Sequence, residues 1–233
     1  MTKRLLLISN STSHGSGYLD HCADEIQDFL GPTKRILFVP FALQDLDGYA
    51  AIARERFAQM GYGLDSIHES TQAKEAVLSA DALFIGGGNT FRLLNHLIEQ
   101  DLVDDIRQRV ENSMPYIGTS AGSNVACITI KTTNDMPIVE PPTFDALNLV
   151  SFNINPHYLD PDPTSTHKGE TREQRIQEFL EENNCVVVGL REGTWIRAEG
   201  SKATLGGQNG ARLFVRDQEA RELSPGDSLD FLL

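Results

Sequence analysis

The sequence has few cysteines and no long apolar run. Its 233 residues include only Cys22, Cys127 and Cys185, which lie far apart, so neither a disulfide framework nor a zinc-ligand spacing is present. No segment approaches the ~20 apolar residues of a membrane-spanning helix. The apolar run after Lys3 and Arg4 is too short for a signal peptide. These absences predict a cytoplasmic protein with reduced cysteines.

Positive charge is also scarce. Lys and Arg together number 20 against 33 Asp and Glu, for a formal net charge of −13. A chain with this balance repels phosphate groups, which excludes nucleic acid and anionic membrane surfaces as expected partners. The acidic residues are scattered through the sequence, as on an ordinary solvated surface.

Two common cofactor motifs are missing. The stretch FIGGGNTF, residues 84–91, carries a glycine turn, but Phe91 stands where the dinucleotide-binding fingerprint needs its third glycine. No glycine-lysine pair is followed by Ser or Thr, so there is no phosphate-binding P-loop. Neither dinucleotide binding nor a phosphate-binding P-loop is therefore expected.

Short apolar runs alternate with helical patterns along the first half of the chain. The expected buried strands are 4–9, 35–41, 80–86 and 115–119, and the expected helices are 18–31, 46–61 and 89–112. Strands separated by helices of this length form βαβ units. The pattern predicts an α/β fold with a largely parallel sheet, covered by helices on both faces.

The last third is different. Its apolar runs after residue 184 are short and are broken by Gly-Gly, Asn-Gly and Pro-Gly pairs, which indicates β-hairpins packed onto the main sheet. No repeat or low-complexity linker divides the chain, so residues 1–233 are expected to form a single domain.

The stretch YIGTSAGSNV, residues 116–125, matches the G-x-S-x-G pattern at Ser120. An expected strand precedes it and an expected helix follows it, which is the context of a nucleophile elbow. The amide of Ala121, at the start of that helix, would then face an oxyanion formed on the substrate. A tight strand-to-helix turn without catalytic function is the alternative.

A second glycine turn, Gly86 to Gly88, follows the expected strand at 80–86. Loops that leave neighbouring parallel strands meet at the same sheet edge. The Gly88 amide is therefore a candidate second donor to the oxyanion. Close packing of helix against strand would explain these glycines equally well.

Among the six histidines, His157 follows an expected strand and lies in a proline-rich loop. A general base needs such a rigid position at the sheet edge. His167, ten positions further on, is its rival. The carboxylate that would orient the base is either Asp135 or Glu192. Both lie at expected strand ends, and the residues alone do not choose between them.

Five segments resemble those of a known family, peptidase E, the aspartyl dipeptidase group of serine peptidases. They are GGGNT (86–90), GTSAGS (118–123), NINPHY (153–158), HKGETREQRIQEFL (167–180) and LREGTW (190–195). They occur in the family's order over nearly the whole chain.

The resemblance implies a class I glutamine amidotransferase-like fold and hydrolysis, without metal or cofactor, of dipeptides and some tripeptides that begin with L-aspartate. It makes Ser120 the nucleophile and His157 the base, with the amides of Gly88 and Ala121 as the oxyanion hole. It leaves the third catalytic residue between Asp135, which we favour, and Glu192.

Selection of aspartate requires a cation for its side-chain carboxylate. The segment 167–175 holds Lys168, Arg172 and Arg175, and the pair Thr171 and Gln174 has the spacing of a capping box that would start a helix at Thr171. Arg172 is the preferred anchor. Arg175 is the alternative, and Asn89 beside the glycine turn is a further candidate substrate contact.

Other functions remain open from the sequence. A cyanophycinase-like isopeptidase would share the fold and the elbow. An esterase of the α/β-hydrolase type would need its histidine nearer the C-terminus. A cysteine-dependent amidotransferase would need a cysteine at the elbow tip, where Cys127 does not stand. A binding protein that keeps the elbow only for packing is the non-enzymatic alternative.

We expect small Asp-X peptides as partners, and a monomer or small homo-oligomer.

Overall fold

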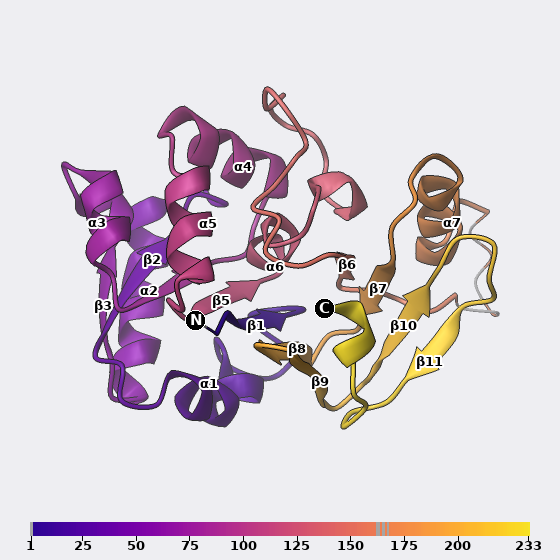
Figure 1. Cartoon of the computed structure of the whole chain (residues 1–233), viewed down its shortest axis with the longest axis horizontal. Coiled ribbons are helices and arrows are strands. Elements are labelled where there is room, and N and C mark those ends of the chain that lie inside the picture. The colour runs from indigo at the N-terminus through magenta and orange to yellow at the C-terminus, as the bar shows by residue number, and fades with distance from the viewer. Residues whose placement is uncertain (1, 162–163, 165, 167) are drawn as a thin grey trace.

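A computed structural model describes residues 2–161, 164, 166 and 168–233. Its larger sheet has seven strands in the order β3-β2-β4-β5-β1-β8-β9 (Figure 1). These strands are β1 (Arg4–Ile8), β2 (Arg35–Val39), β3 (Gly63–Ser66), β4 (Ala82–Ile85), β5 (Tyr116–Thr119), β8 (Thr194–Glu199) and β9 (Lys202–Gly207). The first five are parallel, and β8 and β9 add an antiparallel hairpin beside β1.

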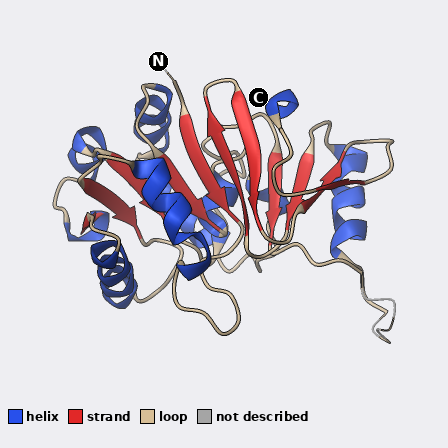
Figure 2. Ribbon diagram, turned by 90° about the horizontal axis from the view of Figure 1, so that it is seen from below, coloured by secondary structure: helices blue, strands red, loops and turns tan. Residues whose placement is uncertain are grey.

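The central strands are apolar throughout because both faces of this sheet are covered. Along β1, Leu5 and Leu7 join the core on one face, whereas Leu6 and Ile8 join the core on the other. This alternation follows from the two-residue period of a strand. The sheet therefore separates two cores (Figure 2).

Helices fill both faces. The core on one side receives α1 (Ala23–Leu30) and α2 (Leu46–Gln59). The core on the other receives α3 (Ala73–Ser79), α4 (Thr90–Glu99), α5 (Val103–Glu111) and α6 (Ala121–Val125). The predicted α/β class, with a parallel sheet between helical layers, is thus confirmed. Within the described residues no helix is both long and apolar enough to span a membrane.

A second sheet holds four strands in the order β11-β10-β7-β6. They are β6 (Asn153–Pro156), β7 (Val187–Leu190), β10 (Ala211–Phe214) and β11 (Arg221–Leu223), and α7 (Arg172–Glu182) lies beside them at the right of Figure 1. Ile154 and Leu190 of this sheet belong to the same core cluster as Leu5 and Ile85 of the larger sheet. On this ground we propose that the chain folds as one domain.

Three details differ from the prediction. The expected helix 89–112 is two helices, because Asp101 takes a positive φ of 53° between α4 and α5. Of the expected C-terminal hairpins, β8–β9 joins the main sheet, whereas β10 and β11 belong to the second sheet. The short elements β3 and α3 were not predicted, since β3 is only half-buried and carries no long apolar run.

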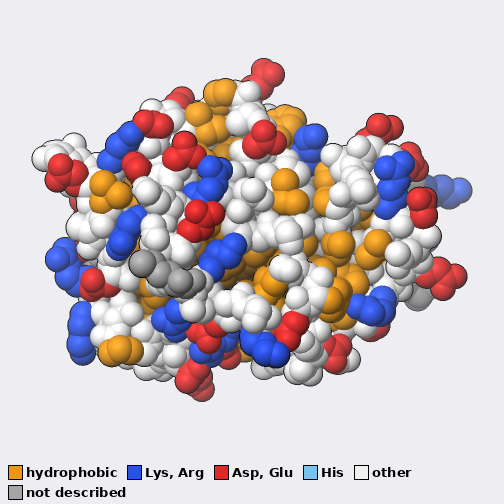
Figure 3. Space-filling view, in the orientation of Figure 1, with side chains coloured by type: hydrophobic (Ala, Val, Ile, Leu, Met, Phe, Trp, Pro, Cys, Tyr) orange, Lys and Arg blue, Asp and Glu red, His pale blue; other side chains and the backbone are white. Residues whose placement is uncertain are grey.

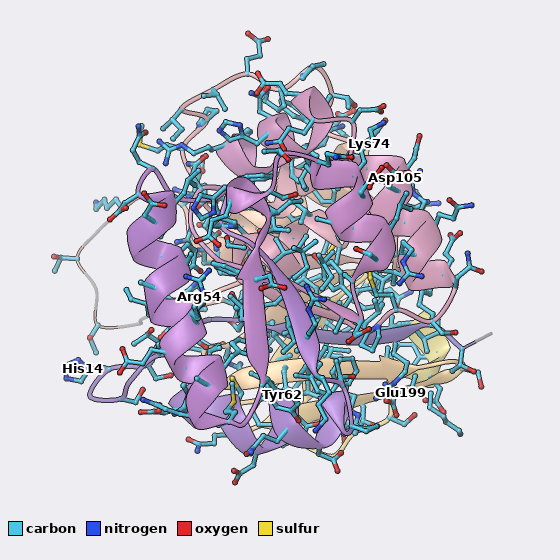
Figure 4. The ribbon with its side chains drawn as sticks, turned by 90° about the vertical axis from the view of Figure 1, so that its left-hand side faces the viewer. His14, Arg54, Tyr62, Lys74, Asp105 and Glu199 are labelled. Carbon is cyan, nitrogen blue, oxygen red and sulfur yellow. The ribbon has the colours of Figure 1, made fainter. Side chains whose placement is uncertain are left out.

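The β3 edge, which Figure 4 views directly, carries exposed ion pairs. Arg54 of α2 pairs with Glu69 at 2.8 Å, and Lys74 of α3 pairs with Asp101. Such pairs contribute little to stability because solvent screens them. Acidic and basic side chains are also interspersed over the face in Figure 3. The features that carry chemistry lie elsewhere, at the carboxyl ends of β1, β4 and β5.

Candidate active site

Ser120 sits on the turn between β5 and α6. Its backbone has φ 51° and ψ −109°, an uncommon conformation for a residue with a side chain. The Ser120 amide donates to the Ile8 carbonyl at 3.0 Å, which ties the turn to β1. A Cβ at Gly122 would come within 2.2 Å of the Ile85 carbonyl oxygen, so only glycine allows this approach. The strained elbow is therefore fixed by its neighbouring strands.

The glycine turn after β4 lies directly against the elbow. A Cβ at Gly87 would sit 3.1 Å from Cβ of Ser120. Gly88 has φ 134°, a conformation that side chains rarely adopt, and a Cβ there would meet the Ala42 carbonyl oxygen at 2.6 Å. Within the described part of the chain, neither the Gly88 amide nor the Ala121 amide donates a hydrogen bond. Both donors remain available beside the serine.

Tyr49 of α2 holds this glycine turn through a hydrogen bond. Its buried hydroxyl accepts a 2.8 Å hydrogen bond from the Gly87 amide. Burial raises the pKa of the Tyr49 hydroxyl, so it stays neutral and able to accept that bond. This hydrogen bond fixes the Gly86–Gly87 peptide, which precedes the peptide that carries the Gly88 amide.

His157 and Glu192 complete a line of hydrogen bonds from Ser120. Nε2 of His157 lies 2.9 Å from Ser120 Oγ, and Nδ1 lies 2.7 Å from Glu192 Oε1. An ionised carboxylate only accepts, so Nδ1 carries the proton and Nε2 is free to accept from the serine. The His157 and Glu192 side chains are 39% and 47% exposed, so the line is open to solvent.

The loops bearing His157 and Glu192 are braced together. His157 has φ 52°, and its amide donates to Ser9 Oγ at 2.9 Å. The Ser9 hydroxyl in turn donates to the Leu190 carbonyl. Arg191, directly before Glu192, also donates two hydrogen bonds of 2.7 and 2.8 Å to Asp160, which lies three residues after His157. These contacts position the imidazole between the two sheets.

Asp135 lies apart from His157. Its Oδ2 accepts from the Thr90 amide at 2.7 Å, from the Thr90 hydroxyl at 2.6 Å and from the Thr133 hydroxyl at 3.0 Å. It thus sits at the N-terminus of α4, where the helix dipole favours an anion. Because the imidazole contacts Glu192 instead, our preference for Asp135 as the orienting carboxylate is corrected.

Asn89 has a structural part in the same region. Its Oδ1 accepts from the Arg92 amide as the N-cap of α4, and its Nδ2 donates to the Met136 carbonyl at 2.8 Å. Both ends of this side chain are engaged within the protein. Asn89 holds the Asp135 loop against the glycine turn, and we no longer assign it a substrate contact.

The capping box expected at Thr171 is confirmed and starts α7. Arg172, at the first position of that helix, is half-buried and forms no ion pair with a described residue, whereas Arg175 is exposed and lies 3.5 Å from Glu170. Burial and the charge of Arg175 lower the pKa of Arg172, and the charge of Asp135 acts in the opposite sense. Lys168 is exposed. His167 lies outside the described residues.

The supporting residues Ser9, Asn10 and Tyr49 were missed from the sequence. Ser9 and Asn10 end the strand beside β5, so their position at the carboxyl edge was a usable signal. Asn10 Oδ1 accepts from the Gly193 amide next to Glu192. Tyr49 gave no such signal, because it lies within the first turn of α2 and not at a strand end. Among the described residues, no group of three or more His, Cys, Asp or Glu is placed to hold a metal.

The chain is similar to known peptidases over most of its length. The family model "Peptidase family S51" matches residues 5–206. A "Peptidase E" of Streptomyces coelicolor is 53% identical over 98% of this chain and 94% of the relative. A Drosophila melanogaster protein named "Probable alpha-aspartyl dipeptidase" is 48% identical over 99% of this chain and 98% of its own.

A solved structure shares the fold. The crystal structure of a peptidase from an acI-B1 actinobacterium superposes with a TM-score of 0.72, at 15% identity, over 98% of this chain and 97% of that one. At this identity the likeness concerns the fold alone. The family match over most of the chain and the relatives near 50% identity show that the chain belongs to peptidase family S51.

Proposed function

We propose that this chain is a serine exopeptidase that hydrolyses dipeptides, and some tripeptides, with an N-terminal L-aspartate. The observation that carries the proposal is the line from Ser120 Oγ through the His157 ring to the Glu192 carboxylate, with contacts of 2.9 and 2.7 Å. This is the geometry of an activated nucleophile, its base and the group that orients the base. The name of the Drosophila melanogaster relative, "Probable alpha-aspartyl dipeptidase", suggests the substrate class.

The residues suggest a two-step reaction. Ser120 Oγ attacks the carbonyl carbon of the aspartyl residue while His157 Nε2 takes the hydroxyl proton. The amides of Gly88 and Ala121 donate to the oxyanion. The C–N bond then breaks as His157 gives its proton to the leaving amine, and an acyl-enzyme ester remains on Ser120. Water, deprotonated by His157, attacks this ester and releases aspartate. Glu192 stabilises the imidazolium that forms in each step.

Arg172 is our proposed anchor for the side-chain carboxylate of the substrate. Its guanidinium is half-buried and has no acidic partner within ion-pair distance among the described residues. A planar guanidinium binds a carboxylate through two parallel hydrogen bonds. Because the chain as a whole is acidic, this local cation rather than long-range attraction would select an acidic substrate.

Hydrolysis of four peptides tests the proposal: Asp-Leu, Glu-Leu, Asn-Leu and N-acetyl-Asp-Leu. We expect turnover of Asp-Leu, far slower turnover of the other three, and loss of activity in Ser120→Ala. Cleavage of simple esters with no cleavage of Asp-Leu would overturn the peptidase assignment in favour of another serine hydrolase.

The substrate anchor has its own test. Arg172→Ala should raise KM for Asp-Leu and narrow the preference for Asp-Leu over Asn-Leu, while Arg175→Ala serves as the matched control on the same helix. Undiminished preference in Arg172→Ala would show that another cation binds the aspartate.

A further inference from the structure

An exopeptidase that removes one N-terminal residue must recognise a free α-ammonium group. In the aspartyl substrate this nitrogen lies only about 2.5 Å from the carbonyl carbon that the serine attacks. The group that accepts it must therefore lie beside the oxyanion donors, on the side of the glycine turn or of the elbow. A carboxylate suits an ammonium best, because the resulting hydrogen bond is charge-assisted.

Most acidic side chains of the described residues near the site are already committed. Glu192 holds the Nδ1 proton of His157 at 2.7 Å. Asp160 is bound through both oxygens by Arg191. Glu170 lies 3.5 Å from Arg175. Each of these carboxylates therefore already faces a cationic or imidazole partner, which a substrate ammonium group would have to share.

Asp135 is different, because its partners among the described residues are all neutral donors and only one of its two oxygens is used. All three of its donors bind Oδ2, and no described residue donates to Oδ1. Two of those donors belong to Thr90, which follows Gly88 by two positions, so the carboxylate is fixed next to the predicted oxyanion donor. The side chain is half-buried, which limits competition from water.

The loop that carries Asp135 is rigid. Asn134, the preceding residue, donates to the Pro156 carbonyl directly before His157, and its Oδ1 accepts from Asn155 at 2.8 Å. Asn89 ties Met136, the following residue, to the glycine turn. Asp135 is thus held between the loop of the base and the loop of the oxyanion donor. Such bracing fits a binding group that must keep its position as substrate arrives.

Arg172 carries the charge opposite to that of Asp135, and it forms no ion pair with a described residue. The charge of Asp135 favours the protonated state of Arg172, although the two do not form an ion pair. An N-terminal aspartate carries one positive and one negative group on neighbouring carbons. Its ammonium and its side-chain carboxylate would fit between this separated pair of opposite charges.

We propose that Oδ1 of Asp135 binds the α-ammonium group of the substrate and so confines the enzyme to free N-termini. Asp135 is then a specificity-determining residue rather than part of the charge relay to Ser120. The inference rests on the proposed function, because it takes the aspartyl residue to be the acyl group that Ser120 receives.

The test compares two anilides that differ only in the amino group: aspartyl α-p-nitroanilide and succinyl mono-p-nitroanilide. In Asp135→Asn the amide oxygen can still accept from Thr90, so the helix cap is kept while the charge is lost. We expect the ratio of kcat/KM for the aspartyl over the succinyl substrate to fall about 10²-fold. Glu140→Gln, an exposed change on the same loop, is the matched control and should keep the wild-type ratio.

A structural role for Asp135 predicts a different result. Both substrates would then lose activity together and the ratio would stay at the wild-type value, which would overturn the inference. If the wild-type enzyme cleaves no aspartyl substrate, the proposed function fails and this inference fails with it. If the wild-type enzyme cleaves the aspartyl anilide and Asp135→Asn keeps the wild-type ratio, this inference is wrong while the proposed function stands.

A measurement on the unmodified enzyme covers the case in which Asp135→Asn does not fold. The α-amino group of a peptide has a pKa of about 7.7–8.0. Since Asp135 would bind its protonated form, kcat/KM for the aspartyl anilide should decline as the pH rises through that range. The succinyl anilide has no such group and should show no decline. Parallel profiles for the two substrates would contradict the inference.

Discussion

Asp135 and Glu192 are the same kind of side chain, and each approaches the site from a loop, yet their partners differ. Glu192 faces the imidazole of His157, while Asp135 faces the hydroxyl and amide of Thr90 at a helix N-terminus. A carboxylate that accepts a hydrogen bond from an imidazole N–H can serve catalysis, whereas one that accepts from neutral groups at a helix N-terminus can serve binding. The comparison teaches that a carboxylate's partners, not its place in chain order, define its role.

The largest expected effect is on the nucleophile and on the base, which Glu192 contacts and Asp135 does not. Ser120→Ala and His157→Ala should each lower kcat for Asp-Leu by about 10³-fold or more, because the members of such a unit act together. Steady-state hydrolysis with purified variants measures this. A double variant should be hardly worse than either single one, and additive losses would contradict a shared step.

The second largest expected effect is the loss of kcat in a Glu192 variant, which distinguishes the role of Glu192 from that of Asp135. Glu192→Gln removes the charge that stabilises the imidazolium and should reduce kcat about 10²- to 10⁴-fold for every substrate, with or without an amino group. The pair of anilides described above measures this. If Glu192→Gln loses activity on the aspartyl substrate alone, the proposed difference between the two carboxylates is wrong, since Glu192 would then act in substrate binding.

A smaller effect is expected at Tyr49, on the oxyanion side. Tyr49→Phe leaves the buried Gly87 amide without its acceptor, which costs about 1–3 kcal/mol of unfolding free energy. Since the next peptide carries the Gly88 donor, kcat should fall about 10- to 10²-fold with little change in KM. Tyr18→Phe is the control, because Tyr18 contacts the Tyr49 hydroxyl at 3.4 Å but not the glycine turn. Equal losses in the two variants would argue for a general packing effect.

The smallest effect concerns the bridge that joins the loops of His157 and Glu192. The hydrogen bonds from Arg191 lower the pKa of Asp160 below its ordinary value. A depressed acidic pKa adds stability above the unfolded value of about 3.9 and loses it as the pH falls through the folded pKa. The stability difference between wild type and Asp160→Asn should therefore be present near pH 6 and shrink below pH 4. Urea unfolding at both pH values measures it, and a constant difference would contradict the assignment.

Much of the site could be predicted because its signals are local. The elbow around Ser120 and the turn at Gly86–Gly88 each follow a buried strand, and a short glycine-rich turn between strand and helix has few alternative structures. The helix start at Thr171 depended on a capping box within four residues. Neighbouring residues determine all three features.

The choice between Asp135 and Glu192 depends on distant parts of the chain. Glu192 reaches His157 because β6 pairs with β7, two strands separated by α7, so that residues 157 and 192 both leave the same edge of the second sheet. The β10 and β11 strands lie in the region where the sequence pattern predicted hairpins packed onto the main sheet. Instead, β10 pairs with β7 and β11 pairs with β10, which completes the second sheet. Pairing between strands so far apart has no signature in local sequence, and neither does the contact from Tyr49 to Gly87.

The most direct test of the account is the reaction of the enzyme with diisopropyl fluorophosphate, which labels activated serines and carries no ammonium group. We expect a single adduct, located on Ser120 by peptide mass spectrometry. Its second-order rate of formation should fall at least about 10²-fold in His157→Ala and in Glu192→Gln, and far less in Asp135→Asn. An adduct on another residue, or a rate that depends on Asp135 and not on Glu192, would contradict the claim that Ser120, His157 and Glu192 form the hydrolytic unit.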